Sequence, residues 1–104
     1  MSLKQNQKQV DEWIANFKLG YFKPLESLAR LTEETGELAR EINHRWGPKK
    51  KKDTEDLKDL EDEIADIIYT LICLANSQDI DLDKAWDKMM DKLYTRDKDR
   101  YERK

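Results

Sequence analysis

Two groups of acidic residues have a spacing that suits the binding of a divalent cation. They are Glu33, Glu34 and Glu37 in the first group, and Asp62, Glu63 and Asp66 in the second. Residues three apart on a helix share a face, so Glu34 lies beside Glu37 and, in the second group, Glu63 beside Asp66. Carboxylate oxygens favour Mg²⁺, Mn²⁺ or Ca²⁺, and protein-bound Mg²⁺ commonly contacts substrate phosphates. These acids are therefore candidate metal ligands for phosphate chemistry.

Both acidic groups border apolar surface. Glu34 lies about 80° around its helix from the centre of the apolar stripe, and Asp66 directly precedes the apolar run from Ile67 to Ala75. A carboxylate that is withdrawn from water needs a cationic partner or a proton. Arg30 offers Glu34 such a partner, and a bound cation would relieve the repulsion among the other acids. The alternative is an ordinary solvated face, because the chain has 23 acidic residues.

The sequence around these acids resembles the motifs of the MazG-like nucleotide pyrophosphohydrolases. Residues Leu31 to Ala39, LTEETGELA, are similar to the E-E-x-x-E signature of that family. The segment Glu63 to Asp66, followed by an apolar helix, is similar to its second motif, E-x-x-D. The order of the motifs also matches, and the resemblance covers nearly the whole chain. The segments Glu37 to Arg45 and Thr95 to Arg100 are most similar to the small YpjD-type members.

The resemblance implies an all-α fold, a four-helix MazG-like bundle, and an enzyme. It implies hydrolysis of an NTP or dNTP to the monophosphate and pyrophosphate with Mg²⁺, or with Mn²⁺ in its place, in the upkeep of the nucleotide pool. Carried over by position, the metal ligands are Glu34, Glu37, Glu63 and Asp66. Glu33 fills the first position of the first motif and is expected to orient water or a second ion.

Phosphate-binding residues are expected near the end of the last helix. The candidates are Lys92, Arg96 and Lys98. Many family members carry an asparagine in this region, but no asparagine follows Asn76 here. The alternative for these basic residues is a solvated helix end.

The candidates to stack on a nucleobase are the aromatic residues Trp13, Phe17, Phe22 and Trp46. Trp46 follows basic residues at a helix end, where a partly exposed ring suits a ligand contact. Trp13 and Phe17 lie on an apolar stripe, so core packing is the favoured interpretation for them. The single histidine, His44, argues against a zinc or di-iron site, because such sites need several histidines or paired E-x-x-H motifs.

Helical periodicity predicts four segments that position these residues. They run from Gln5 to Lys18, from Leu25 to Arg45, from Thr54 to Asn76, and onward from Asp81, a good N-cap residue. Only three glycines and two prolines interrupt the chain, which argues against a sheet. The basic run Lys49 to Lys52 is expected to be a solvated loop, with closure over a triphosphate as the alternative.

Length and charge exclude several classes of protein. The 104 residues suit one domain, residues 1–104, with a charged tail at 95–104. The net charge of −3 argues against general nucleic-acid binding, which needs a basic surface. No apolar stretch approaches the roughly 20 residues of a membrane span. The single cysteine, Cys73, excludes an internal disulfide and, with a polar start unlike a signal peptide, predicts a cytoplasmic protein.

The chain is also expected to associate with copies of itself. A chain this short buries a modest core, and the segment Ile67 to Ala75 is apolar on nearly every side, which predicts a helix buried all round. The family resemblance implies dimers or pairs of dimers as well. We expect a homodimer or a dimer of dimers. The alternative to an enzyme is a non-catalytic helical domain that binds nucleotide or a protein partner.

Overall fold

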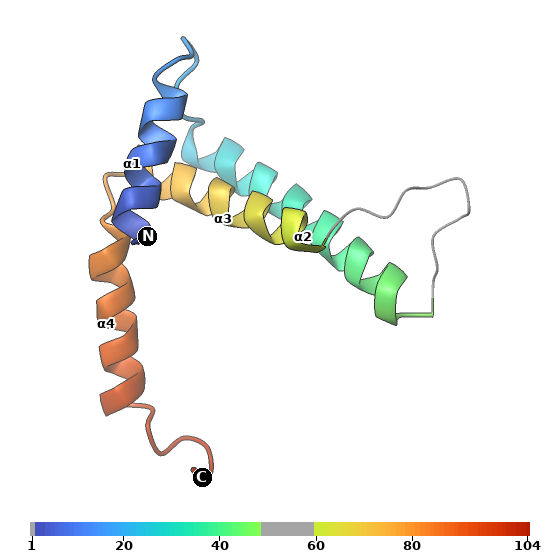
Figure 1. Cartoon of the computed structure of the whole chain (residues 1–104), viewed down its shortest axis with the longest axis vertical. Coiled ribbons are helices and arrows are strands. Elements are labelled where there is room, and N and C mark those ends of the chain that lie inside the picture. Colours follow the sequence, from blue (N-terminus) through green and yellow to red (C-terminus); the bar gives the residue numbers. More distant parts are fainter. Residues whose placement is uncertain (1, 49–59) are drawn as a thin grey trace.

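The computed structural model describes residues 2–48 and 60–104. These residues form four helices and no strand (Figure 1). The helices are α1 (Leu3–Ile14), α2 (Pro24–Trp46), α3 (Leu60–Ser77) and α4 (Leu82–Thr95). The prediction of an all-α fold with four helices is confirmed. The predicted start of the third helix at Thr54 and the basic run Lys49 to Lys52 lie outside the described residues.

The ends of α1 differ from the prediction at both sides. The helix begins earlier because Ser2 caps it: its hydroxyl accepts a hydrogen bond from the Gln5 amide, and the Gln5 side chain accepts one from the Ser2 amide. It ends before Lys18 because the Asn16 side chain donates to the carbonyl oxygens of Glu12 and Trp13. A side chain that bonds to the last turn competes with continuation of the helix.

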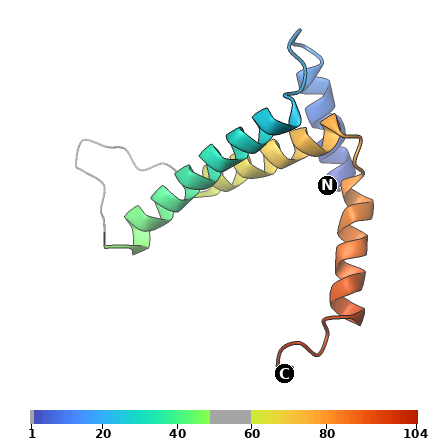
Figure 2. The same cartoon turned by 180° about the vertical axis from the view of Figure 1, so that it is seen from behind.

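The centre of the fold is an antiparallel pair formed by α2 and α3 (Figures 1 and 2). Pro24 occupies the first turn of α2, where its missing amide hydrogen costs nothing. The Glu26 carboxylate accepts a hydrogen bond from the Lys23 amide at the same end. Because the helices run in opposite directions, the middle of α2 faces the first half of α3. The two acidic groups lie in these segments.

The remaining helices meet at one end of this pair. Helix α1 packs against the end of α3, and α4 contacts α1 while its body projects away from α2 and α3 (Figure 1). Asp81 caps α4, as predicted, with its carboxylate accepting from the amides of Asp83 and Lys84. Helix α4 ends at Thr95, and the charged tail continues without helix.

A hydrogen-bond network, which we call the Gln7 clamp, joins three of the helices at this end. The Gln7 amide group donates to the Asn76 side chain at 2.8 Å and to the Ile80 carbonyl oxygen at 2.7 Å. Its oxygen accepts from the amide of Leu82, the first residue of α4, at 3.0 Å. The Asn76 side chain in turn donates to the Tyr21 hydroxyl. The clamp therefore uses both N–H donors and the carbonyl oxygen of one buried glutamine to set the start of α4.

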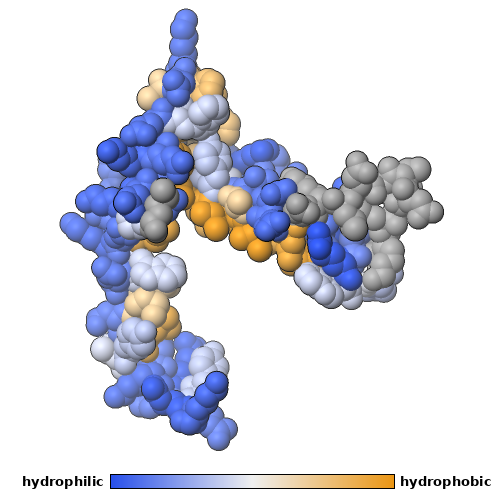
Figure 3. Space-filling view, viewed as in Figure 1, coloured by the Kyte–Doolittle hydropathy of each residue, from blue (hydrophilic) through white to orange (hydrophobic). Residues whose placement is uncertain are grey.

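Much apolar surface stays uncovered within one chain. Among the described residues, only Ile72 and Ala75 are buried hydrophobic residues. The expectation that Ile67 to Ala75 is buried all round is wrong for a single chain, since Ile68 and Leu71 are 48% and 43% exposed. The inner side of the angle between α3 and α4 is the most apolar face in Figure 3. The radius of gyration is 17.4 Å, against about 13 Å for a compact chain of this length.

Candidate metal centre

The α2–α3 pair brings three of the predicted metal ligands together. Glu34 and Glu37 come from successive turns of α2, and Glu63 comes from the first turn of α3. One carboxylate oxygen from each residue lies within 4.8 Å of those of the other two. Oxygen ligands at about 2.1 Å from Mg²⁺ are separated by about 3 to 4 Å. The three side chains are thus close enough to share one cation after small adjustments.

Two of these carboxylates are almost completely removed from water. Glu34 and Glu63 are each only 2% exposed, whereas Glu37 is exposed. The Glu34 Oε1 atom pairs with Arg30 Nη2 at 2.8 Å. Its Oε2 atom is buried and accepts no hydrogen bond from any residue that the structure describes. A buried carboxylate oxygen without a donor, beside two further carboxylates, fits a hard divalent cation.

The charge of Glu34 is unfavourable where it lies. Burial raises the pKa of its carboxyl group above the ordinary glutamate value. The Arg30 guanidinium opposes this increase in pKa, while Glu37, Asp66 and Glu63 add to it through charge repulsion. The carboxylates of the two motifs therefore act on one another electrostatically. The ionised Glu34 carboxylate therefore costs the folded protein stability even with Arg30 beside it.

We expect Glu34→Gln to stabilise the cation-free protein at neutral pH. The pKa of Glu34 is raised above 4.5 in the folded state. Between pH 4.5 and the raised pKa, the folded protein therefore keeps a proton on Glu34 that the unfolded chain releases. The wild type therefore loses stability relative to the variant as the pH rises from about 4.5 through the raised pKa. Urea unfolding with a chelator near pH 4 and near pH 7.5 measures the difference. A variant that is less stable than the wild type at pH 7.5 would contradict this prediction.

The other two predicted site acids lie at the edge of the cluster. Asp66 is half-buried on α3, one turn after Glu63, and close enough to Glu34 to raise its pKa. It lines the same cavity as Glu34. Glu33 is different, since its side chain is 66% exposed and its Oε2 lies 3.4 Å from Arg30 Nη1. The structure thus places Asp66 beside the three central carboxylates and Glu33 at the outer rim.

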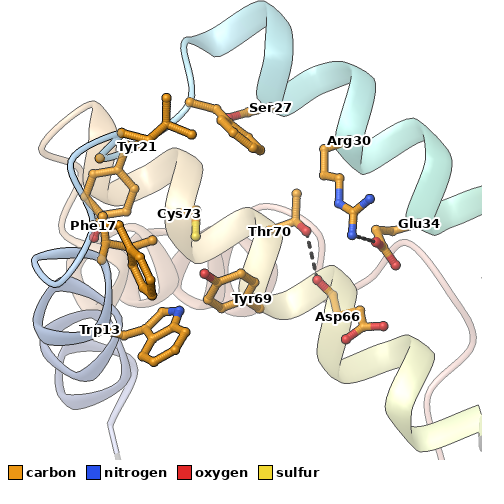
Figure 4. A pocket seen from close by; sticks show the side chains of 14 residues that line it. Trp13, Phe17, Tyr21, Ser27, Arg30, Glu34, Asp66, Tyr69, Thr70 and Cys73 are labelled. Atoms are coloured by element: carbon orange, nitrogen blue, oxygen red, sulfur yellow. Dashed lines mark hydrogen bonds and ion pairs between the residues drawn. The ribbon is translucent and has the colours of Figure 1, made fainter.

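A cavity of about 380 Å³ opens beside the carboxylates. Arg30, Glu34 and Asp66 line one end of it, and aromatic side chains line the other (Figure 4). The aromatic end contains Trp13 and Phe17, whose rings meet edge to face with centroids 4.9 Å apart. The cavity therefore joins a place suited to a planar apolar group with a place suited to cations and phosphates.

The aromatic end of the cavity contains residues for which the sequence favours core packing over a ligand contact. Trp13 and Phe17 lie on an apolar stripe that predicts a core, but they are 55% and 50% exposed in one chain and line the cavity. Tyr21 and Phe22, from the connection between α1 and α2, line it too. The signal was present in the sequence as an aromatic i, i+4 pair followed closely by two more aromatic residues.

The predicted substrate-binding residues do not join the carboxylates within one chain. Trp46 is the last residue of α2, about 18 Å along the helix from Glu34. Lys92 lies near the end of α4, Arg96 caps that helix, and Lys98 follows in the tail. Because α4 projects away from α2 and α3, these basic residues lie apart from the carboxylate cluster (Figures 1 and 2).

The fold and the paired acidic motifs define the class of protein. Residues 22–101 match the MazG nucleotide pyrophosphohydrolase domain, so the chain belongs to this family. The predicted enzyme class, a hydrolase that acts on phosphoric anhydrides, is confirmed by this membership. Within residues 2–48 and 60–104, no helix combines the length and apolar character that a bilayer crossing requires.

Particular relatives are similar over nearly the full length. YpjD of Bacillus subtilis (strain 168) is 58% identical over 103 residues, which cover 99% of this chain and 93% of that protein. The crystal structure of YpjD from Bacillus subtilis, described as a candidate pyrophosphatase, has a TM-score of 0.82 at 56% identity, covering 91% of this chain and 97% of that one. A Bacillus-conserved MazG protein, described as a nucleotide pyrophosphohydrolase, has a TM-score of 0.79 at 47% identity, covering 95% and 96%.

Proposed function

We propose that this chain is a Mg²⁺-dependent pyrophosphohydrolase of nucleoside triphosphates, which cleaves an NTP or dNTP to the monophosphate and pyrophosphate. The observation that carries the proposal is the position of the carboxylate cluster. Glu34 belongs to the three-carboxylate cluster with Glu37 and Glu63. Together with Asp66 it also lines the end of a cavity whose other end is aromatic. A nucleotide has the same two-part character, with a planar base at one end and an anionic phosphate chain at the other.

In this proposal the four motif acids hold the cation. Glu34, Glu37, Glu63 and Asp66 present only oxygen ligands, which suit Mg²⁺ and also Mn²⁺. When bound, the cation supplies charge neutralisation along the phosphate chain and activates water for attack at the α-phosphorus. Glu33, at the exposed rim, is suited to orient water or a second ion.

The aromatic end of the cavity is the proposed place for the base. Stacking of a base on an aromatic side chain is worth about 1–3 kcal/mol and tolerates several bases. Trp13, Phe17 and Tyr21 supply the aromatic rings there. The volume of about 380 Å³ lies at the lower end of the range for ligand pockets, which suits a base with part of its sugar.

We further propose that the working form is a homodimer or a dimer of dimers. Helix α3 exposes Ile64, Ile68 and Leu71, and α4 exposes Trp86 and Leu93. A second copy of the chain is the proposed partner for these surfaces. The uncovered faces of α3 and α4 are both apolar and meet at an angle, so the same faces of another copy can pack against them. A second copy would also provide the route by which Lys92, Arg96, Lys98 and Trp46 of one copy approach the cluster of another.

Product analysis over a panel of nucleotides tests the proposed reaction. The four ribonucleoside and four deoxyribonucleoside triphosphates are incubated with the protein in Mg²⁺, in Mn²⁺ and in a chelator. We expect equal amounts of monophosphate and pyrophosphate from at least one nucleotide with either cation and none with the chelator. Release of inorganic phosphate and a diphosphate would show another reaction. Binding of a nucleotide without any product would favour the non-catalytic alternative.

A further inference from the structure

Arg30 pairs directly with a buried carboxylate of the cluster, and the proposed reaction gives it no role. It lies one turn before Glu34 on α2 and contacts both the exposed Glu33 and the buried Glu34. Its Nη2 atom is 2.8 Å from Glu34 Oε1, and its Nη1 atom is 3.4 Å from Glu33 Oε2. The Arg30 side chain is 52% exposed, whereas that of Glu34 is only 3% exposed. Arg30 therefore reaches from solvent to a buried carboxylate.

The position of Arg30 in the cavity matters as much as its partners. Arg30 lines the same cavity as Glu34, Asp66 and the aromatic side chains. In Figure 4 the Arg30 guanidinium points toward Glu34, and Ser27 lies nearer the start of α2. A nucleotide with its base among the aromatic rings and its phosphates at the carboxylates would pass this guanidinium.

We propose that Arg30 is a phosphate-positioning residue that exchanges partners. In the cation-free protein it pairs with Glu34; when Glu34 is taken up by a divalent cation, the guanidinium turns to phosphate oxygens of the bound nucleotide. This inference rests on the proposed function, because it requires both a cation and a nucleotide at this site. In this proposal Arg30 couples binding of the cation to binding of the nucleotide.

The exchange follows from the properties of the guanidinium group. Arginine stays protonated in proteins and offers five N–H donors in a rigid fork, which matches phosphate oxygens. A divalent cation on Glu34 would lie within a few ångströms of the guanidinium, and two positive charges at that distance repel each other in a low-dielectric site. Arg30 therefore weakens binding of the cation alone. A phosphate chain relieves that repulsion and supplies new acceptors, so Arg30 strengthens binding of the nucleotide with the cation.

The test measures two affinities that should move in opposite directions. Mn²⁺ binding without nucleotide is measured by calorimetry for the wild type and for Arg30→Gln. Binding of the non-hydrolysable α,β-methylene analogues of ATP, GTP, CTP and UTP is then measured in saturating Mg²⁺, and the tightest wild-type ligand is used for the variants. We expect Mn²⁺ to bind about 3–10-fold more tightly to Arg30→Gln and the analogue to bind about 10–100-fold more weakly.

Two further variants separate the proposed role from a general effect of charge. Arg45→Gln removes the same charge from the same helix, and Arg45 also pairs with a buried glutamate, its Nε lying 3.7 Å from Glu41 Oε2. It lies about 22 Å along α2 from Arg30, so both affinities should stay at the wild-type values. Arg30→Lys keeps the charge but loses the fork, so Mn²⁺ affinity should stay unchanged while the analogue binds more weakly.

The outcomes distinguish this inference from the proposed function. The wild type could bind both Mn²⁺ and an analogue while Arg30→Gln changes the two affinities in the same direction or not at all. In that case the proposed exchange of partners by Arg30 is wrong, and the proposed metal and nucleotide site is retained. If the wild type binds neither ligand, the proposed function itself is wrong. Melting curves show whether each variant is folded, which matters most for Arg30→Gln because it removes the recorded partner of the buried Glu34 carboxylate.

Discussion

Replacement of Glu63 by glutamine should lower kcat/KM for the preferred nucleotide by about 10³-fold. Glu63 is the most deeply enclosed of the motif acids, and it is the one that α3 contributes to the three-carboxylate cluster. Glutamine keeps the shape of the side chain but removes the negative charge, so a cation loses a strong ligand and the phosphate chain loses its neutralising charge. Pyrophosphate release at several nucleotide and Mg²⁺ concentrations measures the effect.

A matched control on the same helix makes this result specific. Glu61→Gln removes one negative charge from the first turn of α3 at an exposed position, and it should retain nearly all of the activity. Melting curves of the Glu63→Gln protein and of the wild type without cation distinguish loss of a metal ligand from loss of the fold. Full activity of Glu63→Gln would remove this carboxylate from the proposed metal site.

The second large effect concerns assembly, and it should follow from one substitution on α3. We expect the wild type to be at least a dimer at micromolar concentration and Leu71→Asp to be a monomer with a lower melting temperature. The chain exposes 8825 Å², against about 6200 Å² for a compact protein of its mass, and this excess exceeds the roughly 800 Å² per partner of a standard interface. Leu71 lies on the uncovered apolar face, where a carboxylate would have to be buried on association.

Light scattering and melting curves at several concentrations distinguish the outcomes. The melting temperature of an associating protein rises with its concentration, and that dependence should disappear in Leu71→Asp. Gln78→Asp adds the same charge just beyond α3, at an exposed polar position, and should leave the mass of the assembly unchanged. A wild type that scatters as a monomer would overturn the expectation of a homo-oligomer.

Local signals in the sequence were enough to predict the helices and which acids share a face of each helix. The cap at Asp81, the proline at the start of α2 and the apolar stripes act within a few residues, so they can be recognised without knowledge of the fold. Spacing within one helix carries no information about the next helix. The joint ligand set that includes Glu34 and Glu63 therefore came from the resemblance to a known family.

The direction of α4 and the composition of the cavity could not be predicted in this way. Helix α4 is set by Gln7, an ordinary polar residue on α1 whose hydrogen-bond partners are 69 to 75 positions away. Trp13 and Phe17 have the spacing of core residues. Residues with the same spacing line a cavity when no further helix packs over them. Arg30 likewise has the i, i+4 relation to Glu34 of a common surface ion pair, and only the burial of Glu34 gives it greater importance.

The Gln7 clamp also has a consequence for the order of folding. Its hydrogen bonds join residues 69 to 75 positions apart, so closing them costs more loop-closure entropy than pairing α2 with α3. We therefore expect α2 and α3 to pair first and α4 to acquire its direction afterwards. The amide of Leu82, which donates to Gln7, is therefore a natural reporter of this last step. Its hydrogen exchange would follow the release of α4 separately from the unfolding of the α2–α3 pair.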